Sequence, residues 1–156
     1  MRLRRPSASS RAVLLAVSVL LVLSAFALPA SASHRTQFIH TKQWFESPRQ
    51  ECASGTFEAS GAVTASGNAR SCARKFYPPS KVRGTTELHN GDDLSVVWNL
   101  QCRDEDGRAR HFECTGQWQV NGPNWVGGGQ ARLVLDFFAA PYGTADFTFN
   151  GNLSPA

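Results

Sequence analysis

The chain has 156 residues, with 16 lysines and arginines against 12 aspartates and glutamates, a formal net charge of +4. Four of the basic residues lie within the first 11 positions, whereas every acidic residue lies beyond position 32, so the remainder carries 12 charges of each sign. This balance argues against a nucleic acid or an anionic membrane as a partner. The roughly 124 residues after position 32 suffice for one domain with a hydrophobic core.

Residues 1–32 have the pattern of a secretory signal peptide. Arginines come first, an apolar stretch occupies residues 12–28, and Ala30-Ser31-Ala32 provides the small side chains of a cleavage site. Because the apolar stretch is slightly long for a signal core, an uncleaved anchor is the alternative. We expect cleavage after Ala32, a secreted protein without a membrane anchor, and a single domain over residues 33–156.

The exported part predicts strands almost throughout. Apolar residues recur at every second position in several segments, and no window of a dozen residues shows helical spacing. Residues 38–45 form a first candidate strand, and residues 55–64 form a second whose inner face is thinned by glycine. Heavier apolar faces follow at residues 94–102 and 114–120.

The turn Asn90-Gly91-Asp92 predicts the first register. A three-residue loop there sets Leu88 opposite Leu94 and Gly84 opposite Trp98, which leaves room for the indole ring. Residues 82–88 and 94–102 therefore form an antiparallel hairpin.

The next hairpin is set by Cys102 opposite Cys114. This register places Trp98 opposite Trp118 and gathers the apolar side chains on one face, with Val97 as the exception, whereas a shift of one residue would turn the whole set outward. The charged residues 103–113 then form a hairpin tip in water, closed at its base by a disulfide.

Residues 129–138 and 144–153 predict a final hairpin, joined through Ala140-Pro141-Tyr142-Gly143. Six to eight short strands separated by turns indicate an all-β fold, an antiparallel meander that closes into a barrel. A sandwich is the alternative.

All four cysteines lie in the exported part, at positions 52, 72, 102 and 114. An even number in an oxidising compartment indicates two disulfides, for which three pairings exist. The hairpins favour Cys52 with Cys72 and Cys102 with Cys114. Because no C-x-x-C spacing is present, zinc binding is the less favoured use, and we expect no metal and no cofactor.

Three stretches resemble a group of small secreted actinobacterial proteins. They are GTFEASGAV (55–63), TGQWQVNGPNWVGGGQARLVLDF (115–137) and TADFTFNGNL (144–153). That group is similar to the allene oxide cyclase and dirigent-like barrels, so the resemblance implies an eight-stranded antiparallel barrel. Its common pattern supplies no catalytic residue that can be matched to this chain.

Trp98, Trp118 and Trp125 are the candidate ligand-binding residues, because aromatic side chains dominate the walls of small-molecule cavities in barrels. The alternative for Trp98 and Trp118 is that they fill the core. For Trp125, which lies among glycines, the alternative is packing over an open end of the barrel.

One local motif resembles a different class of protein. The segment Cys72-Ala73-Arg74-Lys75-Phe76-Tyr77-Pro78 is similar to the reactive loop of subtilisin-inhibitor-like proteins. The resemblance implies a reactive loop containing Arg74 and Lys75, with Arg74 as the specificity residue, and a disulfide between Cys72 and Cys102. A disulfide would hold such a loop rigid against cleavage.

The sequence shows no enzyme motif such as H-E-x-x-H, G-x-S-x-G or a P-loop. We therefore expect a monomer that binds, without catalysis, a small apolar ligand or an extracellular protein. A secreted serine-protease inhibitor and a cyclase-like barrel enzyme are the alternative functions.

Overall fold

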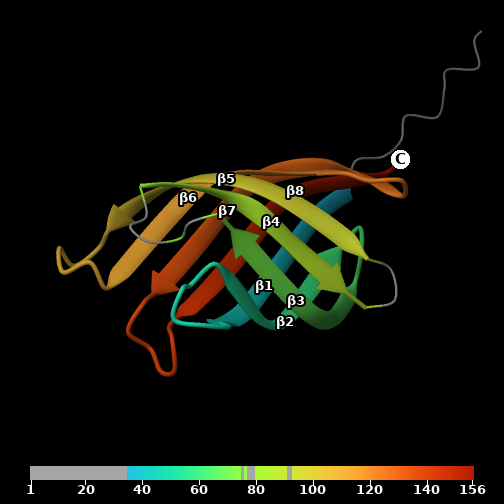
Figure 1. Ribbon diagram of the computed structural model, residues 1–156. Coiled ribbons are helices and arrows are strands. Elements are labelled where there is room, and N and C mark those ends of the chain that lie inside the picture. Colours follow the sequence, from blue (N-terminus) through green and yellow to red (C-terminus); the bar gives the residue numbers. More distant parts are fainter. Residues whose placement is uncertain (1–34, 75, 77–79, 91–92) are drawn as a thin grey trace, which may run out of the picture. The chain divides into compact units, whose positions relative to one another are not determined.

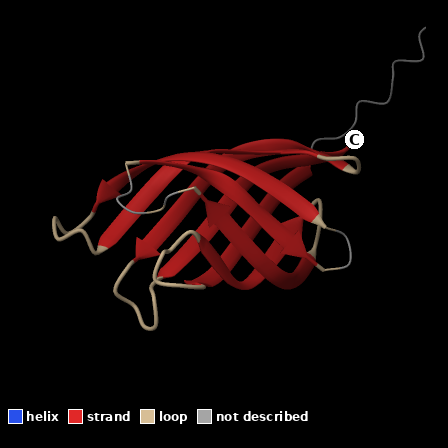
Figure 2. Cartoon of the chain, viewed as in Figure 1, coloured by secondary structure: helices blue, strands red, loops and turns tan. Residues whose placement is uncertain are grey.

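The computed structural model describes residues 35–74, 76, 80–90 and 93–156, and their regular structure is entirely β (Figures 1 and 2). Eight antiparallel strands follow one another around a closed barrel, in which β1 also pairs with β8. The strands are β1 (Arg35–Phe45), β2 (Cys52–Gly61), β3 (Ala65–Ala73), β4 (Lys81–His89), β5 (Leu94–Asp104), β6 (His111–Asn121), β7 (Trp125–Asp136) and β8 (Thr144–Pro155). The predicted antiparallel barrel is confirmed, whereas the predicted signal peptide, residues 1–32, lies outside the described residues.

Strands β4, β5 and β6 pair in the predicted registers. Gly84 lies opposite Trp98 and Leu88 opposite Leu94. Trp98 in turn lies opposite Trp118. Trp98 and Trp118 are both buried, whereas Val97 on the other face is 37% exposed. The side chains that alternation predicts to face the interior of the barrel are therefore the buried ones in these strands.

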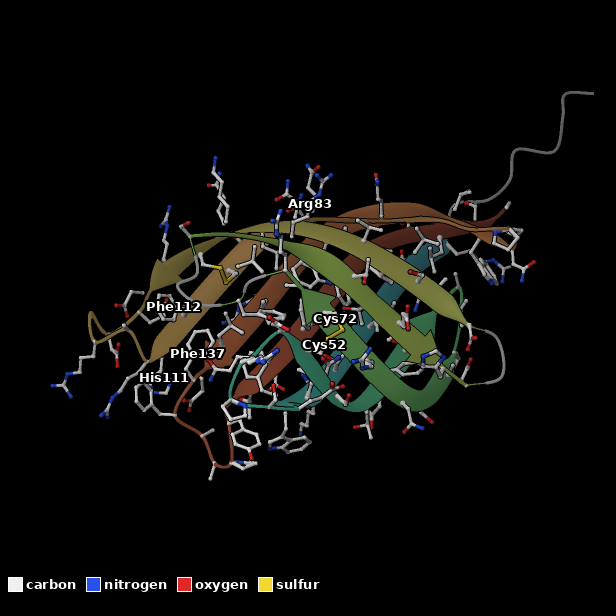
Figure 3. The ribbon with its side chains drawn as sticks, in the orientation of Figure 1. Cys52, Cys72, Arg83, His111, Phe112 and Phe137 are labelled. Carbon is white, nitrogen blue, oxygen red and sulfur yellow. A yellow bond between two sulfur atoms is a disulfide. The ribbon has the colours of Figure 1, made fainter. Side chains whose placement is uncertain are left out.

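The hairpin between β5 and β6 has a shorter tip than predicted. Arg103 pairs with Glu113 and Asp104 with Phe112, so the strands continue past the disulfide and only residues 105–110 form the tip. Phe112 is buried and packs edge-on against Phe137, with 5.7 Å between ring centroids, at one end of the barrel (Figure 3). This apolar contact explains why the ladder extends into a mostly charged segment.

Both predicted disulfides are formed, and they lie on opposite faces of the barrel wall. Cys52 is bonded to Cys72 and Cys102 to Cys114, across sequence separations of 20 and 12 residues. Cys114 is buried inside, whereas Cys52 and Cys72 are half-buried and follow the outward positions of β2 and β3 (Figure 3). Loops of this length correspond to about 3 kcal/mol of stabilisation each.

Aromatic rings close the end of the barrel at which Phe45 lies. The Phe45 ring lies 5.2 Å from that of Phe76 and 5.8 Å from that of Phe137. Trp98 continues this cluster, 5.9 Å from Phe76 and 4.9 Å from Phe147. Rings at these separations pack as a solid core, so this end of the barrel is filled.

Gly84→Ala tests the fit of Trp98 against β4. A Cβ atom at position 84 would lie 2.7 Å from two atoms of the Trp98 ring and 2.2 Å from the carbonyl oxygen of Cys72. Either the ring or the strand must move, so we expect urea denaturation to show a loss of about 1–3 kcal/mol. In the control Gly122→Ala, the nearest atom is 3.8 Å away. The control should change stability by less than about 0.5 kcal/mol, and equal losses in both variants would contradict the packing described.

Candidate functional site

The end of the barrel opposite the aromatic cluster contains a pocket of about 80 Å³. It lies where the β2–β3, β4–β5 and β6–β7 connections meet. Its apolar wall consists of Ile39, Phe57, Ala59, Val63, Ala65, Leu88, Leu94 and Trp125, and its polar groups come from Gln37, Asn90, Asp93 and Asn124. We call it the mouth pocket. An apolar wall with a few polar groups is the usual composition of a small-molecule site.

Gln37 fixes the polar part of the inner wall. The side chain is fully buried. Its Nε2 donates to the carbonyl oxygen of Val63 at 3.1 Å, while its Oε1 accepts from the Val63 N–H at 2.8 Å. These two bonds tie β1 to the β2–β3 turn, so Val63, which lines the pocket, is held in place by a buried carboxamide.

A histidine and two carboxylates stand at the rim. His89 Nδ1 lies 2.7 Å from Asp93 Oδ1, and His89 Nε2 lies 3.7 Å from Glu87 Oε2. Asp93 lines the mouth pocket, but the three side chains are largely exposed. The described lining residues include no Ser, Thr, Cys or Lys side chain. The described part of the pocket wall therefore offers no hydroxyl, thiol or amine nucleophile.

The three candidate tryptophans occupy different environments. Trp98 and Trp118 are buried, and their Nε1–H groups donate inward, to Thr86 Oγ1 at 2.9 Å and to the carbonyl oxygen of Asn150 at 3.2 Å. Neither is among the described residues that line the mouth pocket. Trp125 is half-buried and lines it. The pocket therefore brings Trp125 together with residues that the sequence did not single out.

Gln43 is a buried polar residue that the pattern of the sequence did not predict. The side chain is fully buried, and neither its Nε2 nor its Oε1 has a hydrogen-bond partner in the part of the chain that the structure describes. It follows Gln37 and Ile39 along the inner face of β1, deeper in the barrel than the pocket. A buried amide without a partner costs about 1–3 kcal/mol. Its signal in the sequence is weak, because a strand with glutamine at alternate positions reads as having a solvent-exposed face.

The resemblance to protease inhibitors implied that Arg74 is the specificity residue. Arg74 is exposed and immediately follows the end of β3. Lys75 lies outside the described residues. Cys72 is bonded to Cys52, so the Cys72–Cys102 bond that this resemblance implied is not formed.

The chain matches no protein-family model, and neither a curated protein nor a solved structure matches it significantly. Both resemblances therefore stay predictions.

The described ranges contain neither a cluster of metal-ligating side chains nor a membrane-spanning helix. No three His, Cys, Asp or Glu side chains within them are grouped as a metal site requires. None of the described segments is a helix of the length and apolarity needed to span a membrane.

Two ion pairs on the outer surface shift the pKa values of their carboxyl groups. Glu46 accepts two hydrogen bonds from the Arg70 guanidinium and one from the Ser54 hydroxyl, which lowers the pKa of Glu46 to about 2. A similar bidentate bond from Arg132 lowers the pKa of Glu113. Neither carboxylate lines the mouth pocket. These shifts mark structural ion pairs rather than a catalytic group.

Glu46→Gln tests the first of these pairs through its pH dependence. Because the pKa falls from 4.5 to about 2 on folding, the pair stabilises the protein above pH 4.5 and its contribution disappears as the pH falls towards 2. The two side chains are 36% and 49% exposed. Solvent screening therefore limits the effect to about 0.5–1 kcal/mol.

Urea denaturation at pH 7 and pH 2 should show the variant destabilised only at the higher pH. Glu58→Gln is the control, because Glu58 is exposed on the outer face of β2 and has no ion-pair partner among the described residues. A loss that is equal at both pH values would show that the carboxylate charge is not responsible.

Proposed function

We propose that the protein is exported and binds, without catalysis, one small and largely apolar molecule in the mouth pocket. The observation that carries this proposal is the contrast between the two ends of the barrel. One end is filled by Phe45, Phe76 and Phe137, whereas the other keeps an apolar hollow beneath Trp125. An apolar pocket that is open to solvent can bind an apolar ligand, because the transfer of such a ligand out of water is favourable.

The size of the pocket limits its ligand. An apolar cavity of about 150 Å³ holds a benzene molecule, and the mouth pocket has about 80 Å³ before Trp125 or a rim side chain moves. The pocket as it stands therefore fits a branched alkyl group, and a single small ring fits when Trp125 or a rim side chain moves outward. A hydroxyl on such a ligand would lie near the rim, where Asn90 and Asp93 carry polar side chains.

Export is supported by two kinds of observation. Residues 1–32 have the pattern of a signal peptide. Both cysteine pairs are bonded, and disulfides persist mainly in oxidising compartments. A cyclase-like activity has less support, because the described pocket wall offers no hydroxyl, thiol or amine nucleophile and its carboxylate, Asp93, is exposed at the rim.

Filling the pocket should weaken binding. Ala65 lines the pocket, whereas the neighbouring Thr64 is exposed and is not among the lining residues. With benzyl alcohol as the probe, we expect Ala65→Leu to weaken binding at least about tenfold from a millimolar Kd, while Thr64→Leu leaves it unchanged. Titration followed by NMR, with the signals of Val63 and Leu88 as reporters, measures both.

Two outcomes would contradict the proposal: no shift of these signals in the unsubstituted protein, or equal binding by the Ala65→Leu variant. Native mass spectrometry of protein purified from its own culture medium would complement the titration by revealing a co-purified small molecule.

Protease inhibition through Arg74 is the second candidate function, supported by the exposure of that side chain. Rigid-loop inhibition needs a disulfide arrangement that braces the reactive segment, and Cys72 here is bonded to Cys52 within the β2–β3 hairpin. We therefore expect trypsin and subtilisin to remain fully active at micromolar protein, and stoichiometric inhibition of either would favour the inhibitor instead.

A further inference from the structure

The outer surface formed by β5 to β8 lacks charge over most of its length. Residues 94–102, 114–131 and 147–156 contain no Lys, Arg, His, Asp or Glu. The outer faces of β1 to β4 differ, because they expose charged side chains of both signs, such as Lys42 and Glu58. The β5–β8 side is thus neutral toward the mouth pocket, whereas its charged residues, such as Arg132 and Glu113, lie toward the aromatic end.

Carboxamides form a row across the neutral side. Asn99 lies opposite Gln117, Gln117 opposite Gln130, and Gln130 opposite Asn150. Neighbouring strands are about 4.8 Å apart, so the four side chains form one continuous line perpendicular to the strands. Gln101 and Gln119 flank the row. These six exposed residues are called the carboxamide face.

The carboxamide face is free to bind another molecule. In the part of the chain that the structure describes, none of its six side chains is hydrogen-bonded within the protein. Each carboxamide offers two donors and an acceptor without carrying a charge. Alternating donors and acceptors on an uncharged surface complement a molecule whose own groups both donate and accept, which is the property of hydroxyl groups.

A hollow and an exposed ring adjoin this face. A hollow of about 200 Å³ lies on the outer surface where β5, β6 and the β6–β7 turn meet, and Val97, Gln119, Pro123 and Trp125 are among the residues lining it. It exceeds the volume of about 150 Å³ that holds a six-membered ring such as benzene. At the opposite edge Phe38, which is 44% exposed, lies opposite Asn150.

We propose that the carboxamide face binds a neutral, hydroxyl-rich glycan chain, with one sugar ring in the hollow beside Trp125. The hydroxyl groups of the chain exchange hydrogen bonds with the carboxamides, while the apolar C–H faces of its rings pack on Trp125 and Phe38. A nucleic acid or an acidic glycan would require basic side chains along its whole length. The six residues of the face are all uncharged, and the basic residues Arg83, Lys81 and Arg132 lie only at its margins. Each hydrogen bond contributes only about 0.5–1.5 kcal/mol net, so binding depends on several of them acting together.

Co-sedimentation with insoluble cellulose and with insoluble chitin tests this proposal. We expect the unsubstituted protein to bind at least one of the two polymers, and to remain bound in 1 M NaCl because the polymers and the six carboxamides are uncharged. The double variant Gln117→Glu with Gln130→Glu retains side-chain size but places two like charges next to each other, and binding should weaken at least about tenfold. Asn68→Asp is the control, because Asn68 is exposed on β3, on the other side of the barrel.

Like charges on directly opposite residues also destabilise a sheet, so a second double variant, Gln117→Thr with Gln130→Thr, is needed. It keeps the strands neutral and should lose binding equally, with an unchanged urea midpoint. Absence of binding to both polymers, retention of binding by the threonine variant, or release by salt would overturn the proposal. Benzyl alcohol titration of the same variant is expected to be unaffected, which separates this surface from the mouth pocket.

Discussion

The pairing of β1 with β8 is the contact on which the rest of the structure depends, because it converts a meander with two open edges into a barrel with none. Ile39 lies opposite Phe149 in this pairing, and both side chains are buried. The ladder is interrupted between the His40–Thr148 and Trp44–Thr144 pairs.

Side chains bridge the gap in that ladder. The Phe147 N–H donates to Thr41 Oγ1 at 3.1 Å, and the Gln43 N–H donates to Asp146 Oδ1 at 3.0 Å. The seam is thus maintained by hydrogen bonds from both faces of the wall, and Thr41 supplies the one from the inner side of β1. Closure also separates the two ends, since successive turns alternate between them. The aromatic cluster and the mouth pocket therefore belong to opposite sets of turns.

The sequence predicted most accurately the strands whose inner faces consist of large apolar side chains. Burial of both Trp98 and Trp118 excludes a shift of one residue, and the pairing of Cys102 with Cys114 then selects the register. By contrast, Gln37 and Gln43 are buried on β1, so alternation of hydrophobic residues could not reveal which face of that strand is internal. The end of β5 was also misplaced, because buried Phe112 lies within a charged run.

The candidate sites depend on information that no single segment contains. The mouth pocket combines residues from three turns, and of these only Trp125 stood out in the sequence. Absence of charge from residues 114–131 is visible in the sequence, but the carboxamide row exists only through the registers of four strands. Trp125 lines both hollows, so the two proposed binding surfaces meet at one half-buried indole.

Nuclear Overhauser contacts between β1 and β8 are the most direct test of closure. A closed barrel predicts contacts between the Ile39 methyl groups and the Phe149 ring, together with slow hydrogen exchange of the Ile39 amide. Absence of those contacts, with β1 amides exchanging at the rate of an unpaired edge strand, would contradict the barrel and with it both proposed surfaces.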